Sequence, residues 1–199
     1  MLLKVMQVSP LFSFIIKVFL WLPVCYWGWY SLAEFSTLVV VNLTEPFLQY
    51  LFPRLISSIE QMGYTMEVIA NVTVPAQNIP DGMIAELPIP VNPLIYSYGL
   101  PLTLALILAS PFNFVKILRN IFISILLFLL IQIWGVSFEA SKVLFLQTPP
   151  ELIGNTSLRS WQLDIVALGY QFGVLILPAI APILAWTLFY RDFIIRFVP

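Results

Sequence analysis

Four long apolar runs, separated by shorter mixed or polar segments, dominate the pattern of the chain. A membrane-spanning helix needs about 20 apolar residues, because each residue adds about 1.5 Å along the helix axis. We therefore expect an all-α polytopic membrane protein whose 199 residues form a single integral membrane domain. The predicted spans lie at about residues 12–41, 94–109, 117–138 and 163–190, and an insert at about residues 43–92 lies outside the membrane.

The first two apolar runs differ from a simple span. The first is long enough to cross a bilayer and project beyond it, and it exceeds the apolar core of a signal peptide, so we expect a retained anchor. The second is short and contains Pro101, which leaves a re-entrant loop as an alternative. We prefer a full crossing, because a re-entrant loop would put Lys116 and Arg119 on the side away from the other clustered basic residues.

The insert begins with a segment of helical period. Thr44 and Glu45 precede Pro46, an order typical of a helix N-terminus. An amphipathic helix lying on the outer membrane interface, bent near Pro53 and ended by Gly63, is the resulting prediction. Its apolar face comprises Phe47, Leu48, Leu51, Phe52, Leu55, Ile56 and Ile59, and its polar face comprises Gln49, Arg54, Ser58 and Gln61.

The rest of the insert changes to a period of two, which is typical of strands. Between Tyr64 and Val74, apolar residues alternate with Thr65, Glu67, Asn71 and Thr73. A turn-rich stretch from Pro75 to Gly82 follows, and alternation resumes from Met83 to Ile89. The pattern predicts a small β-hairpin outside the membrane, in which Pro88 and Pro90 restrict the second strand to a sheet edge.

Composition and charge convert this pattern into a topology. Hydrophobic residues make up 60% of the chain and charged residues only 10%, whereas about 25% of the residues in a soluble domain are charged. Basic residues flanking membrane spans favour the cytoplasmic side. The positions of six of the nine basic residues therefore predict that both termini and the loop after the second span are cytoplasmic. These six are Lys4, Lys17, Lys116, Arg119, Arg191 and Arg196.

Polar residues near the third and fourth predicted spans are the candidates for function. Gln132 and Glu139 are seven residues apart and share one helix face, and Asp164 and Gln171 repeat that spacing. Because these spans run in opposite directions, the two polar faces can meet at matched depths. Gly169 and Gly173 add a seam of small residues that lets a neighbouring helix approach closely.

Two interpretations of these residues remain open. In the first, which we prefer, they are structural: Gln132 bonds with Gln171, and Glu139 pairs with Lys142 or Arg159. In the second, an outward-facing pocket binds a peptide or a lipid head group, and two carboxylates could perform acid–base chemistry if one were desolvated. Such a pocket would comprise Glu34, Gln132, Glu139, Arg159, Asp164 and Gln171.

Several kinds of chemistry are disfavoured by the residues present. The chain has no histidine, and its single cysteine, Cys25, lies in an apolar segment without an activating base, so we interpret it as a packing residue. A lone cysteine also excludes an internal disulfide or a multi-cysteine metal site. We expect no cofactor and no nucleic-acid partner, because the sequence contains no basic patch.

Short segments in each apolar run carry a family resemblance: Leu22–Tyr26 with Trp29–Tyr30, Asn92–Tyr96 with Tyr98–Pro101, Gln132–Val136, and Ala167–Gln171 with Leu177–Pro178. Together they resemble the exosortase H-associated membrane proteins of bacteria. The resemblance implies an inner-membrane companion of a transpeptidase-like sorting protease that handles proteins with a C-terminal sorting helix. It implies no catalytic residues, and the exosortase itself is expected to use Cys, Arg and His.

The combined expectation is a non-enzymatic accessory subunit with an interfacial helix and a periplasmic β-hairpin. It would bind an exosortase-like membrane protease, its sorted proteins, or both, in contact with membrane lipid. The alternative is a membrane enzyme or small-solute permease that uses Glu139 and Asp164. A permease should have a polar track reaching the cytoplasm, and the two helices show none below Gln132 and Gln171.

Overall fold

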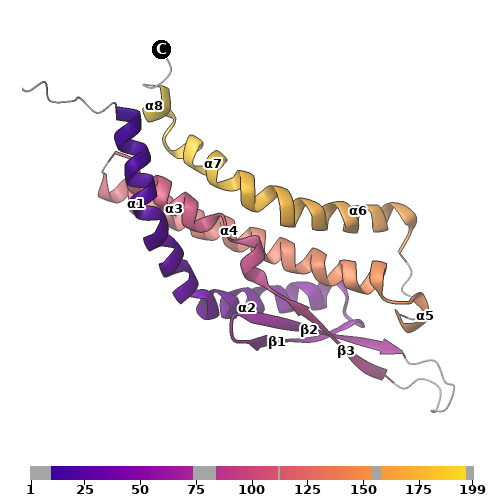
Figure 1. Cartoon of the computed structure of the whole chain (residues 1–199). Coiled ribbons are helices and arrows are strands. Elements are labelled where there is room, and N and C mark those ends of the chain that lie inside the picture. Colours follow the sequence, from indigo (N-terminus) through magenta and orange to yellow (C-terminus); the bar gives the residue numbers. More distant parts are fainter. Residues whose placement is uncertain (1–9, 74–83, 112, 154–157, 196–199) are drawn as a thin grey trace, which may run out of the picture. The chain divides into compact units, whose positions relative to one another are not determined.

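A computed structural model describes residues 10–73, 84–111, 113–153 and 158–195 (Figure 1). Helices dominate, and three short strands lie between α2 and α3 in the sequence. The helices are α1 (Pro10–Ser31), α2 (Ala33–Leu51), α3 (Leu100–Ala109), α4 (Phe114–Lys142), α5 (Pro150–Ile153), α6 (Ser160–Gln171), α7 (Leu177–Phe189) and α8 (Arg191–Ile194). A 3₁₀ turn, η1 (Pro93–Tyr96), precedes α3, and π-helical turns η2 (Val143–Gln147) and η3 (Phe172–Ile176) extend α4 and join α6 to α7.

Within the described ranges, three helices are long and apolar enough to cross a membrane: Leu11–Ser31, Phe114–Gln147 and Ser160–Phe189. They correspond to the first, third and fourth predicted spans. The second apolar run forms η1 and the ten-residue helix α3. At 1.5 Å per residue α3 extends about 15 Å, roughly half of a 30 Å hydrocarbon core. The four-span topology therefore stays a prediction.

The helical part of the insert is displaced from its predicted position. The first helix ends at Ser31, and α2 then continues to Leu51 with Pro46 in its interior. The predicted amphipathic helix is thus wrong over its second half, because Ile56–Met62 form strand β1. Pairing with a neighbouring strand overrides the local helical period, and Pro53 disfavours the helical conformation at Phe52.

The predicted hairpin is confirmed and belongs to a sheet of three antiparallel strands in the order β1-β2-β3. Strands β2 (Thr65–Thr73) and β3 (Ile84–Val91) pair from Met66 opposite Val91 to Thr73 opposite Ile84. The predicted turn between them, with Val74 and Met83, lies outside the described residues. Alternate residues form one apolar, buried face: Ile59, Met66, Val68, Ala70, Val72, Ile89 and Val91.

Helix α2 and the turn at Gly63 hold strand β1, the strand that the sequence pattern did not predict, against β2. Gly63 does not end a helix, as the sequence pattern predicted, but turns the chain from β1 into β2 with a φ of +64° that favours glycine. Helix α2 packs against β1 and β2. Its Gln49 amide donates to the Ser57 carbonyl at 2.8 Å, and Thr37 donates to the Tyr64 carbonyl at 3.0 Å.

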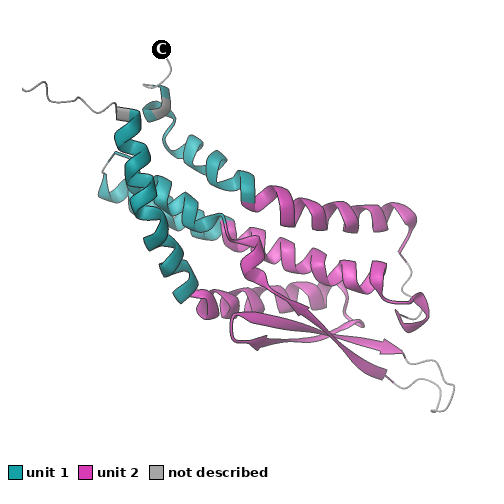
Figure 2. Cartoon of the chain, viewed as in Figure 1, with its two compact units in different colours: residues 1–31, 99–127, 179–199 teal, residues 32–98, 128–178 magenta. Residues whose placement is uncertain are grey.

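The chain divides into two compact units, residues 1–31, 99–127 and 179–199, and residues 32–98 and 128–178 (Figure 2). In unit 1, α1 packs against α3, and Ile107, Ile117 and Tyr190 form an apolar core. Unit 2 contains α2, the sheet, η1 and the segment where α4 faces α6. Unit 1 carries six of the nine basic residues and one of the ten acids, so the two units have opposite charge.

Candidate functional site

The polar side chains of α4 in unit 2 face the 3₁₀ turn η1. Gln132 is buried, with 3% of its surface exposed, and its amide nitrogen donates to the Pro93 carbonyl at 3.3 Å and to the Ser97 hydroxyl at 3.1 Å. Both acceptors lie at the ends of η1, whose start is fixed by the Asn92 side chain accepting from the Leu94 N–H. A buried amide with two partners avoids the penalty of an unsatisfied polar group in an apolar environment.

About two helical turns further along α4, Glu139 makes the second link to η1. The Tyr96 hydroxyl donates to Glu139 Oε2 at 2.7 Å, and the tyrosine itself is only 1% exposed. A hydrogen bond to a carboxylate is stronger than one between neutral groups. Gly135 lies between Gln132 and Glu139 on the same face, and a Cβ there would overlap the Tyr96 ring. Close packing and polar contacts therefore hold η1 against α4.

A neighbouring stripe of α4 faces α6 and η3. The Trp134 indole donates to the Gly169 carbonyl at 3.0 Å, and the Trp134 and Phe138 rings lie 4.6 Å apart. A Cβ at Gly169 would overlap the Phe138 ring, and one at Gly173 would lie 3.0 Å from Trp134. The predicted seam of small residues is confirmed. We call the α4 contacts with η1, α6 and η3 the polar seam.

The structure brings only part of the predicted site together. Gln132 and Glu139 both contact η1, whereas Glu34, Arg159, Asp164 and Gln171 are exposed. Within the described ranges, no hydrogen bond or ion pair joins these six side chains to one another.

The predicted partners of the α4 side chains also differ. Gln132 bonds with η1 and not with Gln171, and Glu139 bonds with Tyr96 and not with Lys142 or Arg159. Lys142 instead lies over the Tyr170 ring at 3.9 Å. The reason is the helical angle: positions 132, 135 and 139 share the stripe toward η1, and positions 134, 138 and 142 face α6.

A cavity of unit 2 lies at the end of the sheet and was missed by the sequence analysis. It measures about 340 Å³ and combines polar and apolar walls. Arg54 is exposed at this cavity, and the Thr73 hydroxyl donates to the Leu152 carbonyl at 3.1 Å beside it. The lining comprises Arg54, Leu55, Asn71, Val72, Thr73, Ile84, Leu152 and Ile153. No sequence pattern indicates this cavity, because the helical period puts Arg54 on the polar face of a helix that does not form there.

Comparison with known proteins adds the family. A model of the exosortase H-associated membrane proteins matches residues 8–193, nearly the whole chain. The chain belongs to this family. The match includes both units of the exosortase H-associated protein and its complete polar seam. No curated protein and no solved structure matches the chain. The resemblance noted in the sequence is therefore confirmed.

Proposed function

We propose that this exosortase H-associated protein is a non-enzymatic accessory subunit of the bacterial inner membrane that binds an exosortase-type protease, its sorted proteins, or both. The family match over residues 8–193 carries this proposal. The polar seam supports it, because Gln132 and Glu139 are engaged in holding η1 against α4. Groups that are already bonded inside a helix interface serve packing, as polar contacts between membrane helices commonly do.

We further propose four spans with both termini in the cytoplasm, so that α3 crosses the membrane with η1 and the sheet is periplasmic. The charge difference between the units supports this topology, because cytoplasmic flanks of membrane spans are enriched in Lys and Arg. Helix α2 would lie at the periplasmic interface. It exposes large apolar side chains, including Phe35, Phe47 and Tyr50, beside a face buried in unit 2.

The sheet supplies the proposed binding surface for an extended peptide. Pro88 and Pro90 lie opposite Ile69 and Glu67 in the sheet. Because proline has no N–H, the N–H groups that β3 directs toward β2 come from the residues between and beside the two prolines. By the same alternation, the N–H groups of Ile84 and Glu86 point to the free edge of β3. An extended segment can add there, next to the Arg54 cavity that Ile84 also lines.

The cavity chemistry suits a peptide with an acidic group. The guanidinium of Arg54 can bind a carboxylate in a bidentate manner, the Asn71 side chain can bond to peptide groups, and Leu55 and Ile153 offer apolar contact. The exposed residues Glu34, Arg159, Asp164 and Gln171 remain candidates for contact with the protease.

Deletion and co-purification test this function. Deleting the gene should leave sorted precursors uncleaved in the membrane, and the wild-type chain should co-purify with the protease in mild detergent. Arg54→Ala should weaken processing while overproduction of the variant restores it, because mass action offsets a lower affinity. Arg191→Ala, which removes an exposed arginine outside the cavity, is the matched control for lost charge.

Two results would overturn the proposal. Unchanged processing in the deletion strain, together with no co-purification, would exclude the accessory role. Conversely, Glu139→Gln combined with Asp164→Asn preserves size and hydrogen bonding while removing both charges. Complete loss of processing in that variant, with normal protease assembly and no rescue by overproduction, would indicate an enzyme.

A further inference from the structure

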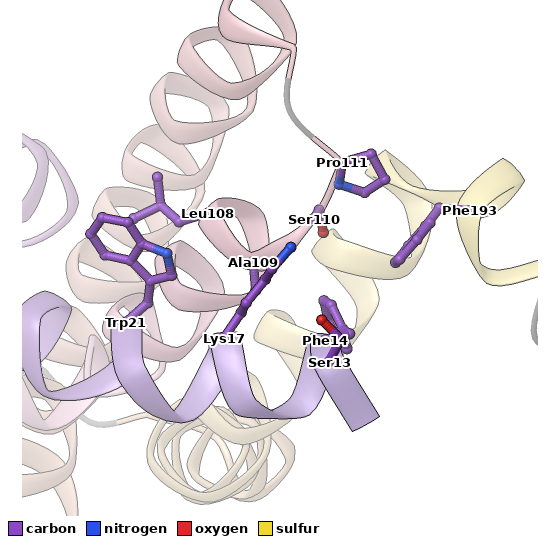
Figure 3. A pocket seen from close by; sticks show the side chains of 9 residues that line it. All are labelled: Ser13, Phe14, Lys17, Trp21, Leu108, Ala109, Ser110, Pro111 and Phe193. Atoms are coloured by element: carbon purple, nitrogen blue, oxygen red, sulfur yellow. The ribbon is translucent and has the colours of Figure 1, made fainter. Parts of the chain in front are cut away.

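Unit 1 contains a cavity of about 450 Å³ where α1 begins and α3 ends (Figure 3). Its walls mix one cation, two hydroxyl-bearing residues and three aromatic rings: Lys17, Ser13, Ser110, Phe14, Trp21 and Phe193. In Figure 3 the Lys17 side chain crosses the cavity with its amine toward Ser110 and Pro111, while Trp21 and Phe193 stand at opposite sides. The cavity is therefore amphipathic, with a positive centre.

Lys17 has no negative partner in the part of the chain that the structure describes. Among the described residues it makes no hydrogen bond or ion pair, and unit 1 contains a single acid, Asp192, against six basic residues. The α1 residues around it are apolar and exposed, with Phe19 and Leu20 at 70% and 68%. An ammonium group on such a helix carries a large penalty unless an anion or water accompanies it. An anion bound beside Lys17 would offset this penalty.

The aromatic wall is held by ring contacts and hydrogen bonds within unit 1. The Phe14 ring stacks on Trp186 with centroids 5.3 Å apart, and its edge contact with Phe193 measures 5.8 Å. The Trp186 indole donates to the Ser110 hydroxyl at 2.9 Å, and that hydroxyl donates to the Leu106 carbonyl at 2.7 Å. A wall fixed in this way loses little conformational entropy when a ligand enters.

Under the proposed topology, the spacing along α1 orders these groups from the cytoplasmic side inward. Ser13, Lys17 and Trp21 are four residues apart and therefore lie on one face, with about 6 Å between successive positions. A hydroxyl and an ammonium thus precede an indole ring along the helix. This order matches a phospholipid, whose phosphate accepts from hydroxyl and ammonium groups and whose glycerol and acyl parts contact apolar rings.

We propose that this cavity binds the phosphate of an anionic phospholipid, with Lys17 and Ser13 as donors and Trp21 packing against the lipid body. Basic cavities between membrane helices on the cytoplasmic side are suited to such head groups. Lys116, Arg119 and Arg191 add positive charge to the same unit and attract anionic lipid toward it. The site is separate from the sheet and the polar seam, so it stands or falls independently of the accessory function.

The test measures how much phosphatidylglycerol and how much phosphatidylcholine the full chain retains. The chain is taken from nanodiscs of these lipids and delipidated, and the lipid that stays bound is measured by native mass spectrometry. We expect the wild-type chain to retain phosphatidylglycerol preferentially. Lys17→Gln should lower that preference by roughly fivefold, the effect of one basic residue near an anionic surface. Lys17→Arg should keep the preference, and Ser13→Ala should reduce it. Arg159→Gln, at an exposed arginine of unit 2 outside the cavity, is the matched control.

Further arms separate the sources of the anion. If millimolar inorganic phosphate displaces the lipid from the wild-type chain, the site recognises free phosphate and the lipid proposal fails. Equal retention of both lipids, or unchanged preference in a well-folded Lys17→Gln variant, would also overturn it. If Lys17→Gln does not fold, the Ser13→Ala and Lys17→Arg pair decides. Loss of protease co-purification in Lys17→Gln with normal lipid preference would instead indicate a partner carboxylate at this position.

Discussion

Gln132 shows how a single polar residue inside an apolar helix is used in this protein. Its amide joins α4 to both ends of η1, through Pro93 and Ser97. Replacing Gln132 with Leu removes both bonds and leaves the Pro93 carbonyl and Ser97 hydroxyl without that donor. We expect the free energy of unfolding to fall by about 0.6 kcal/mol, and by no more than about 1.7 kcal/mol, the average and the maximum measured for such contacts in membranes. Unfolding in mixed detergent micelles measures this change.

A double-mutant cycle identifies the partner of Gln132. The changes Gln132→Leu and Ser97→Ala should be less than additive, because both remove one shared bond. Gln171→Leu is the matched control, since Gln171 is exposed and has no contact with Gln132. Non-additivity between positions 132 and 171 would show that the contact with Ser97 is not the one formed in the membrane.

Glycines on α4 and α1 make a second test at the residue scale. A Cβ at Gly135 would overlap the ring of Tyr96, which is buried and tied to Glu139. Gly28 on α1 has open space around the corresponding position. Gly135→Ala should therefore destabilise the protein by about 1–3 kcal/mol through overpacking. Gly28→Ala should be neutral or stabilising by up to about 1 kcal/mol, because alanine is the better helix former.

The same unfolding assay compares the two glycine variants. A Gly135→Ala chain as stable as the wild type would mean that η1 does not pack against α4 as closely as described. Loss of stability in Gly28→Ala would mean that this face of α1 is covered by a neighbour.

At the scale of elements, the sheet shows which strands the sequence pattern predicts and which it does not. The alternation from Thr65 to Thr73 predicted β2, because one face of that strand is buried and the other is mostly half-buried and polar. The segment Ile56–Met62 fits the period of a helix better than that of a strand, because Ile56, Ile59 and Met62 are three residues apart and a register shift between Ile56 and Ser58 interrupts the strand alternation. Only the pairing with β2, a contact made by tertiary structure, decides between them.

The candidate site was predictable to a similar degree. The spacing of Gln132 and Glu139 correctly placed both on one face of α4, and Gly169 and Gly173 correctly indicated a close helix contact. The partner of that polar face was wrong, because the periodicity of one helix does not say which neighbour each stripe meets. The turn η1, which supplies Tyr96 and Ser97, lies in an apolar run and offered no polar period to detect.

The edge of β3 gives a prediction at this scale. Pro88 and Pro90 leave half of that edge without N–H donors, which limits uncontrolled strand pairing. Replacing both prolines with threonine restores two donors on an exposed strand. We expect increased self-association of the purified chain, measured by sedimentation velocity in detergent. Pro149→Thr, at an exposed proline outside the sheet, should leave the protein monodisperse to the same degree as the wild type. Equal behaviour of the two variants would mean that this edge is already covered.

For the whole molecule, the separation of charge between the units has a topological meaning. Unit 1 holds the basic cluster and unit 2 holds nine of the ten acids together with the sheet. Because Lys and Arg near spans stay in the cytoplasm, the proposed topology puts both chain termini and the start of α4 in the cytoplasm and the sheet in the periplasm. The ten-residue helix α3 is the element on which this arrangement depends.

Thiol labelling in spheroplasts decides whether α3 crosses the membrane. In a Cys25→Ser background, single cysteines replace the exposed residues Glu86 in β3, Asn113 before α4, and Glu151 in α5. Four spans predict that positions 86 and 151 react with a membrane-impermeant reagent in intact spheroplasts, and that position 113 reacts only after lysis. If α3 did not cross, position 113 would be labelled before lysis and position 151 only after it, because α4 would then run in the opposite direction. Labelling of position 113 before lysis would refute the four-span topology. It would also place Lys116 and Arg119 outside, against the charge rule on which that topology rests.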